Sequence, residues 1–267
     1  MSNERAGQCR LCKEHSDLCE SHVIPAFVYA WMRESSVGHM RSSANPNVRI
    51  QDGPKFYWLC RSCEQRLGKW EKRFAEVVFR YVHATSADQR PCSYGPWALK
   101  FACSVSWRVL LYFQDKGFTR LSEHQISLVT KAEATWREFL LGKRPHPGAF
   151  EQHVLPVDVI DSHSGTKLSP SINRYLIRAV DADLVSCPTE AFVYSKLCRL
   201  MIFGFIQQEK PRWSGTKLNA RSGKIGSSKY EMSGKLLNFW NGKADTIAQQ
   251  ITSLSPRQKQ KVQAVYN

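Results

Sequence analysis

The sequence predicts a mixed α+β fold in three segments. Two Cys-x-x-Cys pairs lie far apart within residues 1–90, which indicates a small module that a metal ion holds together. Apolar residues recur at helical spacing through residues 91–149, which predicts a helical middle segment. Residues 150–267 combine several β-like runs with two helical ones, which predicts a small, mainly antiparallel sheet with C-terminal helices and a basic surface.

Composition limits the class of protein. The chain has 267 residues, of which 42% are hydrophobic, and this is enough for one large core or two modest ones. No apolar run reaches the ~18 residues of a membrane span, and the polar start of the chain is unlike a secretory signal. Nine cysteines in such a chain favour a reducing compartment. We therefore expect a cytoplasmic protein that uses cysteines to bind metal.

The net charge limits the class of partner. The formal charge is +15 at pH 7, which favours polyanions. Nucleic acid is the first expectation, and an acidic protein or a membrane surface is the second. The alternative is a soluble basic protein whose charge serves no binding role.

The first segment alternates between strand and helix signals. Residues 21–25 form a short strand or turn, and Pro25 suits the first position of an apolar helix over residues 26–32. Residues 35–54 are polar and rich in turn signals, which predicts a loop. An aromatic strand at residues 55–59 leads into the second cysteine pair. The helix after that pair is amphipathic, with apolar residues at Leu67, Trp70, Phe74, Val77, Val78, Tyr81 and Val82.

The middle segment begins with a predicted buried helix. Residues 97–116 are apolar on nearly every side, which is typical of such a helix. Arg108 interrupts it, and a buried guanidinium needs a carboxylate or phosphate partner. We expect Glu71 or Glu76 to be that partner and to dock the two helices. The alternative partner is a substrate phosphate.

Helix and strand signals continue through the rest of the chain. Ser122 and Gln125 form a capping box that predicts a further helix, which Gly142 ends. Strands are predicted at residues 154–160, 175–180, 191–206 and 217–220. Two helices are expected after them, at residues 234–252 and after Ser255-Pro256.

The two cysteine pairs are Cys9 with Cys12 and Cys60 with Cys63. Four thiolates are the ligand set of a closed tetrahedral zinc site, and such a site stabilises a fold directly. We therefore predict a structural Zn²⁺ ion on these residues. A second ligand set has local zinc-knuckle spacing and consists of Cys9, Cys12, Cys19 and His22. It would leave the second pair without a role.

His22 lies in a His-x-x-Pro sequence after the first pair, and a predicted helix opens at the second. This arrangement resembles the treble-clef members of the HNH endonuclease superfamily over residues 9–82. The resemblance implies a treble-clef, ββα-like fold and hydrolysis of phosphodiester bonds. It also implies that His22 is the general base that activates water, and that a divalent metal neutralises charge on the scissile phosphate. A bacterial, phage-related or defence setting is expected on the same ground.

The chain differs from that family at three positions. Ser21 precedes His22, where the family usually has aspartate or histidine. Glu64 follows the last cysteine, where the family often has histidine, and residues 55–58 contain no asparagine. We expect Glu64 to hold Mg²⁺ or Mn²⁺ beside His22, with Glu71 behind it on the same helix face. In the alternative, both glutamates pair with basic residues on a solvated surface, and His22 is structural or a zinc ligand.

A basic stretch covers residues 196–235, with Trp213 and Tyr230 interleaved. Basic loops with nearby aromatic rings suit phosphate contacts and base stacking. We expect nucleic acid to contact Lys210, Arg212, Lys217, Arg221, Lys224 and Lys229. The alternative is a charged, solvated loop region.

The leading hypothesis is a metal-dependent HNH-type endonuclease with His22 and Glu64 as catalytic residues. The competing hypothesis is a non-catalytic, zinc-stapled module that binds nucleic acid or protein. A protein partner is also compatible with the apolar helix at residues 97–116, which suits an interface as well as a core. A nicking assay with and without divalent metal, beside a gel-shift assay, separates the two hypotheses.

Overall fold

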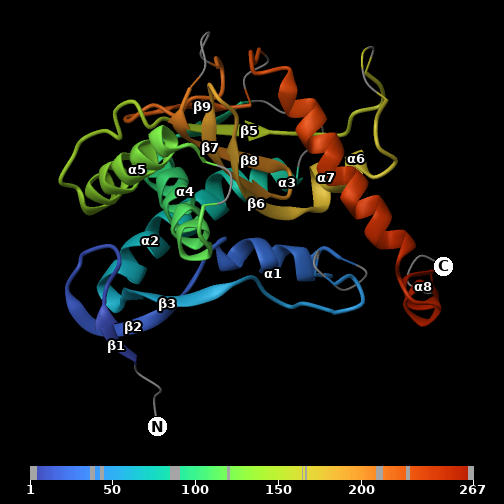
Figure 1. Cartoon of the computed structure of the whole chain (residues 1–267), viewed down its shortest axis with the longest axis horizontal. Helices are drawn as coiled ribbons and strands as arrows, with labels where there is room; N and C mark the ends of the chain where they lie inside the picture. Colours follow the sequence, from blue (N-terminus) through green and yellow to red (C-terminus); the bar gives the residue numbers. More distant parts are fainter. Residues whose placement is uncertain are drawn as a thin grey trace.

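The computed structural model describes residues 5–36, 40–42, 45–84, 91–118, 121–163, 165, 167–208, 213–226 and 229–263. The described residues form three antiparallel sheets and a set of helices (Figure 1). The structure is a mixed α+β fold with small antiparallel sheets, which confirms the predicted fold class.

The N-terminal sheet has the strand order β1-β2-β3 and is antiparallel. Its strands are β1 (Arg5–Gln8), β2 (His15–His22) and β3 (Lys55–Cys60). The aromatic strand before the second cysteine pair is therefore confirmed. A short strand or turn was predicted over residues 21–25, whereas β2 begins at His15, where its first half pairs with β1, and ends at His22.

Four helical elements belong to the same segment. They are α1 (Ala26–Glu34), α2 (Arg61–Phe74), a π-helical turn η1 (Ala75–Phe79) and α3 (Arg80–Ala84). Pro25 precedes α1 as its N-cap residue, one position before the place predicted for it. The run from α2 to α3 is uninterrupted, so the predicted amphipathic helix is confirmed, with a π turn in its middle.

Two long helices make up the middle of the molecule, as predicted. Helix α4 (Pro96–Lys116) is buried along most of its length. Helix α5 (Glu123–Leu141) starts at the predicted capping box, in which the Ser122 hydroxyl accepts a hydrogen bond from the amide of Gln125. It ends at Gly142, whose φ of 80° is a left-handed conformation that glycine adopts without strain. The short strand β4 (Cys92–Tyr94) precedes α4.

The largest sheet has the strand order β5-β8-β7-β6 and is antiparallel throughout. Its strands are β5 (Gln152–Pro156), β6 (Val180–Ser186), β7 (Ala191–Leu197) and β8 (Leu200–Gln207). The strand predicted at residues 154–160 ends at Pro156, which has no backbone N–H to continue the pairing. The β-like run at residues 191–206 becomes the hairpin of β7 and β8.

Two strand predictions in this segment are wrong. Residues 172–178 form helix α6 (Ile172–Arg178), because Ile172, Tyr175 and Leu176 share one buried side at helical spacing. Residues 217–220 form no named strand, and only Lys217 pairs, through an isolated bridge to His153. The strand that does form there is β9 (Gly223–Ile225), which pairs with β4. The predicted C-terminal helices are confirmed as α7 (Lys235–Thr252) and α8 (Pro256–Gln263).

The core lies on both faces of the four-stranded sheet. Alternate residues of β7 and β8 point to opposite faces: Val193 and Ile202 pack toward α4 and α5, whereas Tyr194 and Phe203 pack toward α6 and α7. Helix α4 contacts α2 as well as this sheet, and it is therefore buried on all sides. The larger cluster of buried apolar residues extends from Cys9 to Ile225, so all three predicted segments contribute to it.

Candidate metal centre

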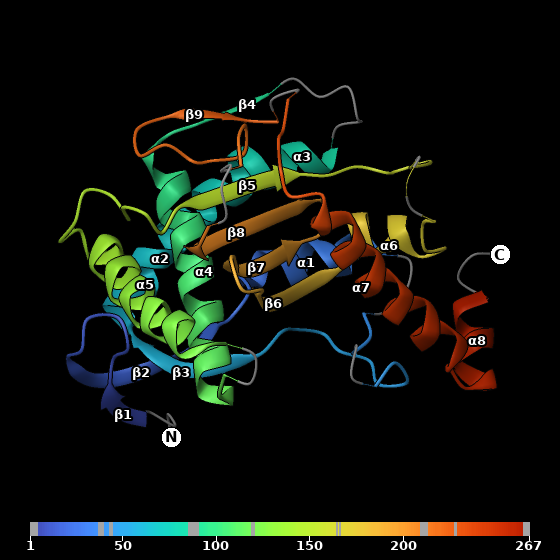
Figure 2. The ribbon, with the colours of Figure 1, turned by 45° about the horizontal axis from the view of Figure 1, so that its top comes forward.

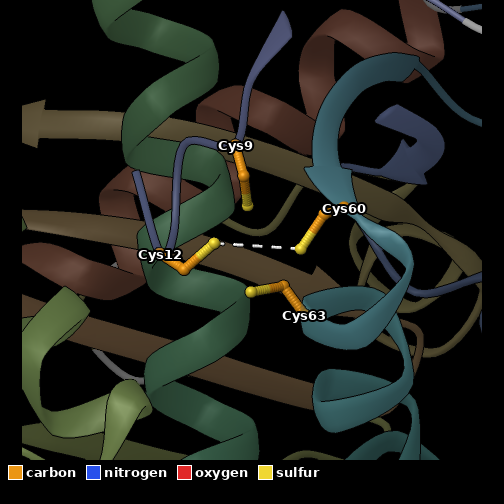
Figure 3. Close-up of side chains that lie close together, drawn as sticks. All are labelled: Cys9, Cys12, Cys60 and Cys63. Carbon is orange, nitrogen blue, oxygen red and sulfur yellow. Dashed lines mark hydrogen bonds between the residues drawn. The ribbon is translucent and has the colours of Figure 1, made fainter. Parts of the chain in front are cut away.

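Four cysteines from two distant parts of the chain meet in the N-terminal module (Figure 3). Cys9 and Cys12 lie in the loop between β1 and β2, Cys60 ends β3, and Cys63 lies in the first turn of α2. Their four sulfur atoms are within 4.8 Å of one another. Cys19 and His22, which complete the second predicted ligand set, are not part of this group.

The cluster has the chemistry and the dimensions of a structural zinc site. In a regular tetrahedron with Zn–S bonds of about 2.3 Å, neighbouring sulfurs are about 3.8 Å apart. The Sγ atoms of Cys12 and Cys60 are 3.8 Å apart. Cys9, Cys60 and Cys63 are buried, so no ligand position faces open solvent on their side. The residues present therefore fit a closed site in which four thiolates hold one zinc ion.

Backbone hydrogen bonds shape the loop that carries the first pair. The amide of Lys13 donates to the carbonyl of Cys9, and Lys13 has a φ of 70°, which turns the chain sharply after Cys12. The amide of Arg10 donates to the carbonyl of Trp58 in β3 at 2.8 Å. This bond ties the loop to the strand that leads to the second pair.

The electrostatics of the cluster favour a thiolate. A hydrogen bond from the Cys63 thiol lowers the pKa of Cys9 to about 4, against the opposing effect of burial. Backbone hydrogen bonds from Cys60, Cys12 and Leu11 act in the same direction. The thiolate is the form of cysteine that binds a metal ion.

His22, the last residue of β2, pairs with a carboxylate that the sequence analysis did not single out. Its Nε2 atom lies 2.9 Å from both carboxylate oxygens of Asp52. Lys55 Nζ is 2.9 Å from the same carboxylate. The pairing of β2 with β3 explains this contact, because His22 lies opposite Lys55. Asp52 is three residues before Lys55, so its carboxylate can reach the imidazole.

Asp52 is stabilised in its ionised form. Burial opposes ionisation, but hydrogen bonds from His22, Lys55 and the Gly53 amide outweigh it and lower the pKa of Asp52 to about 2. A carboxylate therefore faces the imidazole throughout the neutral pH range. The ring of Tyr29 stacks with the imidazole, and the centroids of the two rings are 6.4 Å apart.

Glu64 contacts Ser21 rather than His22. The Ser21 hydroxyl donates a hydrogen bond of 2.7 Å to Glu64 Oε2, and Ser21 is fully buried. Successive strand residues point to opposite faces, so Ser21 and His22 direct their side chains away from each other. No contact among the described residues joins the His22 imidazole to the Glu64 carboxylate.

Arg108 has the carboxylate partner expected of it. Its Nη2 atom forms an ion pair of 2.6 Å with Glu71 Oε1. Its Nη1 atom donates to the backbone carbonyl of His22 at 2.9 Å. The guanidinium is 1% exposed, so the prediction that Arg108 docks α4 onto α2 is confirmed.

Comparison with known proteins gives no relative. No protein-family model, curated protein or solved structure matches this chain. Among the residues that the structure describes, none of the helices is both long and apolar enough to traverse a bilayer.

The predicted nucleic-acid contacts of the C-terminal half differ in their surroundings. Lys217 is in an ion pair of 2.5 Å with the buried Glu151, so its ammonium group has a structural partner. Arg221, Lys224 and Lys229 are exposed. Lys210 and Arg212 lie outside the described residues.

Trp213 is not available for base stacking, which corrects the interpretation of the basic stretch. It is 8% exposed, and its ring packs against Phe203 and Phe205 in the core beside the large sheet. The physical reason is the size of its apolar surface, which is removed from water when α7 covers this face.

Proposed function

We propose that residues 9–82 form a treble-clef module of the HNH type that hydrolyses phosphodiester bonds of nucleic acid, with His22 as its general base. The observation that carries the proposal is the contact of His22 Nε2 with the Asp52 carboxylate at 2.9 Å. A carboxylate that accepts the proton of one ring nitrogen fixes the tautomer and leaves a lone pair on the other. Such an imidazole suits the removal of a proton from water near pH 7.

We propose that the four clustered cysteines bind one structural Zn²⁺ ion. Zinc would join the Cys9–Cys12 loop to the start of α2, and so fix β2 and its terminal His22 beside that helix. The same ion would contribute to folding, because the loop and the helix are separated by almost fifty residues of chain.

Glu64 is the residue that we propose as a ligand of Mg²⁺ or Mn²⁺, which would neutralise the charge that develops on the scissile phosphate. The Ser21–Glu64 hydrogen bond supports this assignment. It brings together the residue before His22 and the residue after the last cysteine. These are the two positions at which the resemblance to HNH enzymes implies metal ligands.

The proposal is tested by replacing His22 with alanine and assaying the nicking of plasmid DNA, and of RNA, with Mg²⁺ or Mn²⁺. We expect a loss of roughly 10²–10⁴-fold in rate, the usual contribution of a general base. The matched control is His124→Ala, which removes an exposed histidine from α5. Zinc content and the far-UV spectrum should be the same in both variants. Undiminished nicking by His22→Ala would refute the assignment.

A second candidate is a non-catalytic, zinc-stapled binding module. The observation that favours it is that both glutamates have partners: Glu64 accepts from Ser21, and Glu71 is neutralised by Arg108. Gel-shift binding without any metal-dependent cutting would select this candidate over the nuclease. The cytoplasmic location, the defence setting and a protein partner stay predictions from the sequence.

A further inference from the structure

The helical run from Arg61 to Ala84 has a strongly basic outer side. We propose that this side, rather than the C-terminal basic loops, binds the phosphate backbone of nucleic acid. The surface is named here the cationic face and consists of Arg61, Lys69, Lys72, Arg73 and Arg80, all of which are exposed. The inference deepens the proposed function, since it adds the surface that holds the substrate.

The charge of the cationic face is not compensated. None of its five side chains makes an ion pair or a hydrogen bond with the residues that the structure describes. Two of the three acids on the same helical run are directed elsewhere, Glu64 to Ser21 and Glu71 to Arg108. Only Glu76 is exposed among the cations. The result is a local excess of positive charge that attracts a polyanion.

The dimensions of the face suit an extended backbone. At 1.5 Å per residue, Arg61 and Arg80 are separated by roughly 28 Å along the helical run, which is about eight nucleotide steps of 3.4 Å. Between residues 61 and 73, the exposed positions cover one arc of the helix at 100° per residue. Several phosphates of one strand can therefore meet cations on one side of the helix.

The composition of the face favours nucleic acid over the other polyanions. Protein interfaces have apolar and aromatic side chains at their centres, and membrane-bound helices present apolar side chains beside their cations. The large hydrophobic residues exposed among the described residues are Val48, Ile126 and Val159, and none of them lies on this helical run. Trp70 is half-buried beneath Lys100. The face therefore offers phosphate contacts without base stacking, and binding should be insensitive to sequence.

Gly68 connects the cationic face to the candidate site. It lies one turn from Glu64 and from Lys72, between the acidic edge and the basic side of α2. A Cβ atom placed there would meet nothing within 4 Å apart from its chain neighbours and the backbone of its own helix. Glycine inside a helix lowers stability by about 1 kcal/mol relative to alanine. Here the missing side chain leaves open surface between Glu64 and Lys72. A strand held on the face can approach Glu64 at this point.

The test compares three variants that each remove two charges. The first is Arg61→Gln/Lys72→Gln on the cationic face. The second is Arg221→Gln/Lys224→Gln in the C-terminal basic stretch, and the third is Arg257→Gln/Lys259→Gln on α8. All six residues are exposed, and α8 lies at the far end of the molecule from α2 in both views (Figures 1 and 2).

Binding of a 30-base-pair DNA duplex, a single-stranded RNA and polyglutamate is measured against salt, without added divalent metal. Because no cutting is required, failure of this inference is distinguishable from failure of the proposed nuclease activity. We expect the first variant to bind nucleic acid about tenfold more weakly and to lower the magnitude of the log–log salt slope by about 2. The α8 variant should change neither quantity by more than about twofold.

Three results would overturn the inference. The first is a C-terminal variant that loses more affinity than the cationic-face variant, and the second is an equal loss in all three variants. The third is tighter binding of polyglutamate than of either nucleic acid, which would identify an acidic protein as the partner. A stronger loss with the duplex than with the single strand, or the reverse, identifies which form of nucleic acid the face prefers.

Discussion

The guanidinium of Arg108 donates a hydrogen bond of 2.9 Å to the backbone carbonyl of His22. The same guanidinium forms an ion pair with Glu71 of α2. One side chain of α4 therefore holds the end of β2 and the face of α2 together. Because α4 also packs against the large sheet, this contact fixes the candidate site to the core of the whole molecule.

Replacing Arg108 with methionine should destabilise the fold by about 3 kcal/mol or more, because Glu71 is left as an uncompensated, mostly buried charge. The double variant Arg108→Met/Glu71→Gln should recover part of this loss, since the remaining group is neutral. Urea unfolding of the wild type, both single variants and the double variant measures the coupling. Simple additivity of the two single effects would show that the pair is not coupled.

Replacing Cys60 with serine should abolish zinc binding and unfold the N-terminal module. The cause is that binding energy at a site built from distant ligands is folding energy. Elemental analysis should give one zinc per wild-type chain and none in the variant. Cys19→Ser is the matched control, since Cys19 lies in β2 outside the cluster and its loss should leave the zinc content unchanged. Loss of zinc from Cys19→Ser, with zinc retained by Cys60→Ser, would favour the second ligand set.

The ion pair of Asp52 should make stability depend on acid pH. Its pKa in the fold is about 2, below the ordinary value of 3.8, so its contribution is complete above pH 4. That contribution is lost as the pH falls from about 4 to 2, because the folded carboxylate must then take up a proton. Thermal midpoints of the wild type and Asp52→Asn should therefore differ at pH 6 and converge near pH 2. Asp245→Asn, on the exposed side of α7, should follow the wild type throughout.

Replacing Lys217 with glutamine should reduce stability more than it reduces nucleic-acid binding. Lys217 pairs with Glu151, which is 4% exposed, and Glu151 also lies 3.4 Å from His153. Loss of the ammonium group removes one partner of a buried carboxylate, at a cost of about 1–3 kcal/mol. Thermal unfolding and gel shift are compared for this variant and for Lys224→Gln. Unchanged stability together with weakened binding would contradict this expectation and would indicate that Lys217 contacts nucleic acid.

Much of the local structure could be predicted from the sequence because its signals are local. The apolar periodicity of residues 97–116 and the capping box at Ser122 depend on neighbours within a few positions. The prediction of a strand at residues 175–180 was wrong because it used only such local signals. A short apolar run fits a strand and a buried helical turn equally well, and packing against α7 decides between them.

The sequence by itself determined that two cysteine pairs act together, because two Cys-x-x-Cys pairs match the ligand set of one tetrahedral zinc site. Only the tertiary structure decided which groups surround His22. The contacts of Asp52 with His22, of Ser21 with Glu64 and of Arg108 with Glu71 each join elements far apart in the chain. Such contacts depend on strand register and helix packing, which the spacing of residues along one segment does not specify.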